Sequence, residues 1–233
     1  MKLLLISNST NAGEEYLRYP LPEIGRFLEG VSEVAFVPYA AVTFSYAAYE
    51  AKVQARLAEL GIRVRSVHRS KNPAREIRDA EAICVGGGNT FALAKKMQEQ
   101  GLMQAILRKI KAGTPYVGWS AGSNVACSTI CTTNDMPIVQ PESFRAIGAV
   151  KFQINPHYLD ANPAGHAGET REQRILEYIA ANPRRWVAGL REGCMLRYEE
   201  GRLELLGNRP MRIFKHGREP FEVNPGETLD FLL

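Results

Sequence analysis

Long apolar runs are missing from this chain of 233 residues. The first apolar run, at 3–6, ends at the polar Ser7 and is too short for the apolar core of a secretion signal. Nothing later in the sequence approaches the roughly 20 apolar residues that a membrane helix needs. We therefore expect a cytoplasmic protein that has no membrane partner.

Cysteine is also scarce, and the four cysteines lack the paired spacing of a zinc site. Cys127 and Cys131 can share one face of a helix, but two thiols do not make a metal site. We expect free thiols in a reducing compartment, and neither a metal nor a cofactor.

Blocks of lysine and arginine are absent too, although the net charge is +4. A spread of mild positive charge is not typical of a protein that binds nucleic acid. What remains is an ordinary globular composition, 45% hydrophobic and 23% charged. For a chain of this length, one domain over 1–233 is the simplest account.

Short apolar runs predict strands in the first half of the chain, and they lie at 2–6, 33–38, 62–67, 82–85 and 115–117. Helical spacing of apolar residues predicts helices between these strands, at 21–28, 46–60, 72–79, 90–97 and 103–111. The apolar stripe of the helix at 46–60 consists of Tyr46, Tyr49, Val53, Leu57 and Leu60.

Continuous apolar strands that alternate with helices are typical of a parallel sheet covered on both faces. The predicted fold class is therefore α/β, with a doubly wound, mostly parallel sheet. The second half is less regular. It has predicted strands at 151–154 and 186–190, and an antiparallel hairpin over 195–206. Between these strands, Thr170 and Gln173 form a capping box that opens a helix.

The stretch Gly-Trp-Ser-Ala-Gly at 118–122 follows a predicted strand and precedes a segment that can open a helix. This order is typical of a nucleophile elbow, in which a serine sits on a sharp turn between small neighbours. The helix that follows directs free amides at a developing oxyanion. Ser120 is the candidate nucleophile, and the amide of Ala121 is a candidate oxyanion donor.

A second glycine run, 86–88, ends another predicted strand. It lacks the lysine of a phosphate-binding loop. Carboxyl ends of parallel strands share one edge of the sheet, so this run can bring a second amide to Ser120. We expect that amide to come from Gly88, and we take Asn89 as a candidate for substrate binding.

A serine nucleophile needs a base, and His157 is the favoured candidate. It follows Asn155-Pro156 at a predicted strand end, where the backbone is rigid. His166, in a glycine-flanked loop, is the alternative, whereas His68 and His216 are expected at the surface.

The base needs an acid to orient its ring. Asp135 lies in a polar loop soon after the elbow, and Glu192 follows the strand at 186–190. Position favours Glu192 slightly, while the chain order serine, acid, histidine favours Asp135. The sequence leaves both open.

Five motifs in this order resemble one family, the aspartyl dipeptidases of the dipeptidase E type. That family is related in fold to class I glutamine amidotransferases and cyanophycinases. The motifs are Gly-Gly-Gly-Asn-Thr at 86–90, Gly-Trp-Ser-Ala-Gly at 118–122, Thr-Thr-Asn-Asp-Met-Pro at 132–137, Asn-Pro-His at 155–157 and Gly-Glu-Thr-Arg-Glu-Gln-Arg at 168–174.

The resemblance implies cytoplasmic hydrolysis of dipeptides with an N-terminal aspartate, with Ser120 as nucleophile and His157 as base. It maps onto both Asp135 and Glu192, so the choice of acid stays open. It leaves open whether the protein is a monomer or a homodimer. A related hydrolase of isoaspartyl or cyanophycin-type peptides, and a non-catalytic binding module, are the alternative functions.

Arg171 and Arg174 are candidates for binding the substrate carboxylate. Arg171 is expected at the first position of the helix capped by Thr170, where the helix end and a guanidinium together attract an anion. Without the resemblance, the favoured interpretation is that both arginines lie on a solvated face of the helix. The resemblance favours substrate binding by Arg171, with Arg174 assisting.

Overall fold

The computed structural model describes residues 1–162, 165 and 167–233. Its larger sheet has seven strands in the order β3-β2-β4-β5-β1-β8-β9. The parallel strands are β1 (Lys2–Ile6), β2 (Glu33–Val37), β3 (Arg63–Ser66), β4 (Ala82–Val85) and β5 (Pro115–Trp119). The antiparallel hairpin of β8 (Met195–Glu199) and β9 (Arg202–Leu206) completes the sheet beside β1. The predicted α/β class with a mostly parallel sheet is confirmed.

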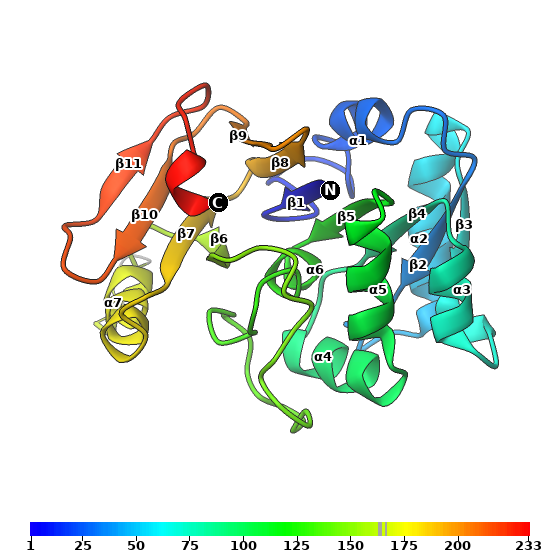
Figure 1. Cartoon of the computed structure of the whole chain (residues 1–233), viewed down its shortest axis with the longest axis horizontal. Coiled ribbons are helices and arrows are strands. Elements are labelled where there is room, and N and C mark those ends of the chain that lie inside the picture. Colours follow the sequence, from blue (N-terminus) through cyan, green and yellow to red (C-terminus); the bar gives the residue numbers. More distant parts are fainter. Residues whose placement is uncertain (163–164, 166) are drawn as a thin grey trace.

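Helices cover both faces of this sheet, because alternate residues of its buried strands point to opposite sides. On one face, Leu4 and Ile6 of β1 pack in the same apolar cluster as α1 (Leu21–Phe27) and α2 (Tyr46–Leu57). On the other face, Leu3 and Leu5 pack with α3 (Pro73–Asp79), α4 (Thr90–Glu99) and α5 (Leu102–Lys111). Figure 1 shows α5 and α3 in front of the sheet and α2 behind it. Single 3-10 turns lie at η1 (Ala58–Leu60), η2 (Val67–Arg69) and η3 (Asp230–Leu232).

The later strands form a second sheet, a feature that the sequence did not predict. Its order is β11-β10-β7-β6, and β6 runs parallel to β7. The bounds are β6 (Gln153–Tyr158), β7 (Trp186–Arg191), β10 (Met211–Lys215) and β11 (Phe221–Val223). The strand expected at 151–154 begins instead at Gln153 and continues through Asn-Pro-His.

One face of the second sheet joins the main apolar cluster, and α7 (Arg171–Ala181) covers the other (Figure 1). Ile175 and Ile179 of α7 pack on Val187 and Phe214 of the sheet. The predicted capping box of Thr170 and Gln173 is present at the start of α7. Among the described residues, no helix combines the length and apolar character that crossing a membrane would require.

Candidate active site

Ser120 lies on a strained turn between β5 and the short helix α6 (Ala121–Asn124). Its φ of 53° and ψ of −114° fall where residues with a side chain are rarely found. Small neighbours make the turn possible, since a Cβ on Gly122 would overlap the carbonyl oxygen of Val85. The strand, turn and helix expected around 118–122 are all present.

The elbow is tied to the end of β1. The backbone amide of Ser120 donates to the carbonyl oxygen of Ile6 at 3.0 Å. Oγ of Ser123 donates to the same carbonyl at 2.7 Å. The amide of Ser120 is therefore engaged, whereas the next amide, of Ala121, has no acceptor among the described residues.

His157 lies in a bulge of β6, where the pairing with β7 shifts between Pro156 and Tyr158. Its φ is 52°, a second strained backbone position at the site. Its amide donates to Oγ of Ser7 at 2.9 Å, and that hydroxyl donates to the carbonyl of Leu190 at 2.7 Å. The bulge turns the imidazole towards the elbow, where Nε2 lies 2.9 Å from Oγ of Ser120.

Glu192 directly follows β7, and its Oε1 lies 2.6 Å from Nδ1 of His157. The side chains of His157 and Glu192 are 38% and 44% exposed, so this pair opens to solvent. Strands β6 and β7 are parallel neighbours, and this pairing places their carboxyl ends side by side.

Asp135 is engaged elsewhere. Its Oδ2 accepts from the amide and from Oγ1 of Thr90, at 2.7 and 2.5 Å, at the start of α4. Thr133 donates to the same oxygen at 3.1 Å. The structure thus brings Glu192, and not Asp135, to the imidazole. The alternative base, His166, lies outside the described residues.

The glycine run at 86–88 packs closely around the elbow. Gly88 has a φ of +133°, and a Cβ there would overlap the carbonyl oxygen of Ala40. A Cβ on the preceding Gly87 would lie 2.9 Å from Cβ of Ser120, so the glycine run passes close to the nucleophile. Within the described part of the chain, the amides of Gly88 and Ala121 have no acceptor.

The side chain of Asn89 is held by two hydrogen bonds. Its Oδ1 accepts from the amide of Ala92 at 3.0 Å and caps α4, while Nδ2 donates to the carbonyl of Met136 at 2.9 Å. Both ends of the amide therefore hold the glycine loop and the 135–138 loop together. These contacts give the side chain a supporting role, and substrate binding through its second Nδ2 proton stays a prediction.

A pocket of about 160 Å³ lies beside the strand that carries His157. It contains Arg171 and Arg174 of α7 together with Asp135. Burial lowers the pKa of the Arg171 guanidinium, the charge of Arg174 lowers it further, and Asp135 opposes both. The remaining lining residues are Cys131, Thr132, Thr133, Asn134, Asn155, Ile175 and Tyr178.

The two arginines differ in their surroundings. Arg174 is exposed and pairs with Glu169 at 3.7 Å. Arg171 is half-buried and has no ion-pair partner among the residues that the structure describes. An incoming carboxylate would therefore not have to displace a direct ion-pair partner of Arg171, although Asp135 in the same pocket acts on its charge. A larger surface cavity of about 480 Å³, around Phe91 and Phe144, contains none of the candidate residues.

Several supporting residues escaped the sequence analysis. Asn8 accepts from the amide of Gly193 at 2.9 Å and from the hydroxyl of Tyr19 at 2.7 Å, so it holds the turn that follows Glu192. The sequence feature that could have indicated this role is the pair of polar residues, Ser7 and Asn8, directly after a buried strand.

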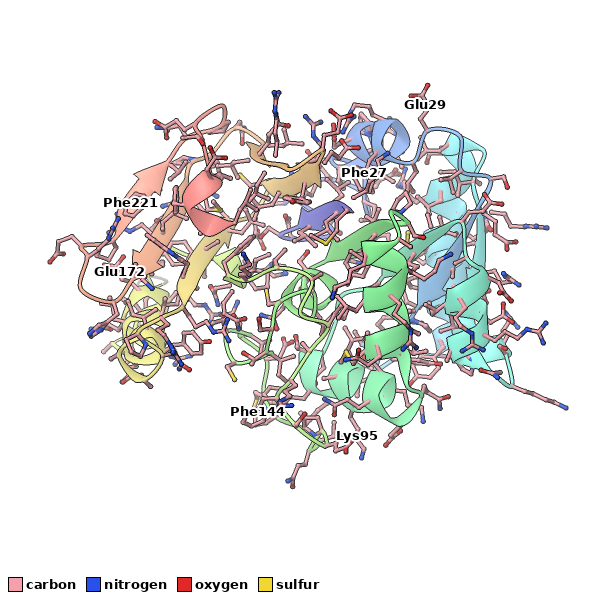
Figure 2. All side chains as sticks on the ribbon, in the orientation of Figure 1. Phe27, Glu29, Lys95, Phe144, Glu172 and Phe221 are labelled. Atoms are coloured by element: carbon pink, nitrogen blue, oxygen red, sulfur yellow. The ribbon has the colours of Figure 1, made fainter. Side chains whose placement is uncertain are left out.

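A chain of ion pairs also supports the site. Arg191, next to Glu192, is buried and donates to Asp160 at 2.9 Å and to Glu222 at 2.8 Å. These bonds raise the pKa of its guanidinium. Arg212 on β10 binds both Glu222 and Glu172, at 3.5 and 3.2 Å. Glu172, the second residue of α7, lies where the start of this helix meets the β10–β11 hairpin (Figure 2).

The elbow presents a serine on a strained turn at the edge of an α/β sheet, and a histidine and a carboxylate follow in line with it. This arrangement is typical of serine hydrolases. The model of peptidase family S51 matches residues 3–206. The chain therefore belongs to peptidase family S51, and it is a serine peptidase.

Curated relatives agree with this family. Peptidase E of Nostoc sp. is 49% identical over 233 residues, which cover all of this chain and 96% of that protein. Peptidase E of Citrobacter koseri is 46% identical over 226 residues, covering 97% and 99%. The crystal structure of a peptidase from an acI-B1 actinobacterium has a TM-score of 0.73 at 19% identity, over 98% of this chain and 96% of that one. That likeness concerns the fold.

Proposed function

We propose that this protein is a dipeptidase that hydrolyses dipeptides with an N-terminal aspartate through an aspartyl-enzyme on Ser120. The observation that carries the proposal is the line from Oγ of Ser120 to Nε2 of His157, at 2.9 Å, and from Nδ1 to Glu192, at 2.6 Å. A nucleophile, a base and an orienting acid need this order of contacts.

In the first half-reaction, Oγ of Ser120 attacks the carbonyl carbon of the aspartyl residue, and its proton moves to Nε2 of His157. Glu192 holds the proton on Nδ1 and stabilises the imidazolium that forms. The amides of Gly88 and Ala121 donate to the oxyanion of the tetrahedral intermediate. When the intermediate collapses, the C–N bond breaks and the leaving amine takes the proton from Nε2.

In the second half-reaction, Nε2 of His157 removes a proton from water, and the resulting hydroxide attacks the ester on Ser120. The same amides receive the second oxyanion. Collapse returns the proton to Oγ and releases aspartate. These residues complete the cycle by themselves, and we propose that no metal or cofactor takes part.

Arg171 is the residue proposed to bind the side-chain carboxylate of the substrate's N-terminal aspartate. Burial and the charge of Arg174 lower the pKa of the half-buried Arg171 guanidinium, which means that they destabilise its charged form. A bound carboxylate would stabilise that charged form. Its place at the first position of α7 adds the positive end of that helix. Arg174 contributes charge at longer range.

The wider setting is also part of the proposal. We expect the enzyme to act in the cytoplasm on small peptides, without nucleic acid, as a monomer or a homodimer. One apolar cluster joins the two sheets, which supports a single domain over 1–233.

The test is metal-free hydrolysis of Asp-Leu, Glu-Leu, Leu-Leu and isoaspartyl-Leu by the same preparation. Cleavage of Asp-Leu alone supports the proposal. Cleavage of isoaspartyl-Leu alone would keep the serine mechanism and overturn the specificity. No cleavage by folded protein would favour a binding module.

A further inference from the structure

The side chain of Tyr49, on α2, joins the two segments that flank the site. Its hydroxyl donates to the carbonyl oxygen of Gly87 at 2.9 Å and accepts from Nε1 of Trp119 at 3.1 Å. Gly87 directly precedes Gly88, and Trp119 directly precedes Ser120. One oxygen atom thus connects the residue before the proposed oxyanion donor with the residue before the proposed nucleophile.

Tyr49 is itself held firmly. The residue is 3% exposed, and its ring packs edge-to-face on Phe36 at 5.0 Å. The hydroxyl of Tyr16 donates to it at 3.3 Å, so the proton and both lone pairs of the Tyr49 hydroxyl are used. Burial raises the pKa of Tyr49, and the hydroxyl therefore keeps the proton that it donates.

The bond to Gly87 controls the amide of Gly88, because the two groups belong to one planar peptide and point in opposite directions. Glycine on both sides leaves this peptide unit little steric resistance to rotation. A half-turn would present the carbonyl oxygen of Gly87 where the amide of Gly88 is needed. A hydrogen bond that holds the carbonyl towards Tyr49 keeps the amide directed the other way.

Tyr49 also limits how closely the glycine run can pack. A Cβ on Gly86 would lie 2.6 Å from the Tyr49 hydroxyl, so the ring is in contact with the backbone there. The donated proton of Trp119 polarises the hydroxyl, and the hydroxyl polarises the peptide that carries the Gly88 amide. Each bond in the series strengthens the next.

We propose that Tyr49 is a positioning residue whose hydroxyl orients the Gly87–Gly88 peptide relative to Ser120 and so preorganises the oxyanion site. This inference rests on the proposed serine mechanism. Preorganised donors act on the transition state more than on bound substrate. We therefore expect loss of the Tyr49 hydroxyl to lower kcat and to leave KM nearly unchanged.

The experiment compares Tyr49→Phe with Tyr16→Phe in hydrolysis of Asp-Leu. Loss of one oxyanion donor costs about 10²- to 10³-fold in kcat, and loss of its orientation should cost about 10- to 100-fold. We expect that decrease in Tyr49→Phe, with KM changed less than about twofold. Tyr16→Phe removes a donor to the same hydroxyl but leaves the bond to Gly87, so its kcat should stay within about threefold of wild type.

A second readout separates positioning from general damage. The aldehyde analogue of the aspartyl residue forms a hemiacetal with the serine and places an oxygen in the oxyanion site. β-Alanine keeps the ammonium and the side-chain carboxylate of that residue but has no oxygen at the position of the scissile carbonyl. Tyr49→Phe should weaken the aldehyde by the same factor as kcat and leave binding of β-alanine unchanged. Equal weakening of both ligands, or wild-type kcat in the folded variant, would overturn the inference.

A measurement on the wild type keeps the inference testable even if Tyr49→Phe does not fold. The backbone amide of Gly88 should have an NMR order parameter near that of rigid strands, about 0.85. A mobile amide at Gly88 would overturn the inference. Ser120→Ala tests the proposed function separately: activity in that variant would refute the serine mechanism, whatever Tyr49 does.

Discussion

Glu192 reaches His157 from the neighbouring parallel strand, with 2.6 Å between Oε1 and Nδ1. Glu192→Gln keeps the shape of the side chain but removes the charge that stabilises the imidazolium. It also offers an amide donor to Nδ1, which favours the wrong tautomer. We predict a decrease of about 10³- to 10⁴-fold in kcat for Asp-Leu with little change in melting temperature.

Asp135→Asn is the matched control for that prediction. Because Oδ2 of Asp135 accepts from Thr90 at the start of α4, its loss should lower the melting temperature and change kcat less than about tenfold. The reverse ranking of the two variants in kcat would assign the orienting role to Asp135.

The specificity prediction concerns Arg171. A charge-assisted hydrogen bond to a carboxylate is worth about 1.5–3 kcal/mol, so Arg171→Met should lower kcat/KM for Asp-Leu by about 10- to 100-fold. Arg174→Gln should have a smaller effect, since that side chain is exposed and already pairs with Glu169. A larger loss in Arg174→Gln than in Arg171→Met would move the carboxylate site to Arg174.

Local patterns carried much of the prediction from sequence. Apolar runs and helical spacing located the parallel strands, and small residues around Ser120 located the elbow. The capping box at Thr170 was also correct, because a cap depends on residues three positions apart. In each case the decisive contacts lie within a few residues of one another.

Contacts between distant segments were not predictable in the same way. The apolar pattern of a strand does not indicate which sheet the strand joins, so the pairing of β6 with β7 in a second sheet was not predicted. The choice between Asp135 and Glu192 depends on that pairing. Tyr49 was expected only as part of an apolar helix stripe, and its hydrogen bond to Gly87 spans 38 positions.

A pH prediction follows from Asp160. The hydrogen bond from Arg191 holds the pKa of Asp160 below its usual value, while burial opposes this. A lowered native pKa adds stability that is present above the unfolded value of about 3.9 and is lost as pH falls through the native value. Asp160→Asn should therefore lower the melting temperature at pH 7, and the difference should shrink below about pH 4.

The size of that difference should be modest. The side chain of Asp160 is 53% exposed, so solvent screens the pair and its net worth is below about 1 kcal/mol. Thermal unfolding of both proteins from pH 7 to pH 3 makes the comparison. A difference that grows as the pH falls would contradict the assigned sign.

The packing of the elbow gives a stability prediction. A methyl group on Gly122 would overlap the carbonyl oxygen of Val85, and backbone on both sides cannot move aside cheaply. Gly122→Ala should destabilise the protein by about 3 kcal/mol or prevent folding. Gly113→Ala is the control for a glycine with open space around it, where the cost is backbone strain of about 1 kcal/mol at its φ of +96°. Equal unfolding free energies in urea for the two variants would contradict the packing argument.

The most direct measurement is kcat/KM for Asp-Leu in Ser120→Ala, on protein shown to be folded by its melting temperature. The account predicts a loss of at least about 10⁴-fold, because no other group can form the aspartyl-enzyme. Activity within about tenfold of the wild type would contradict Ser120 as the nucleophile, and with it the roles proposed for His157, Glu192 and the two amides.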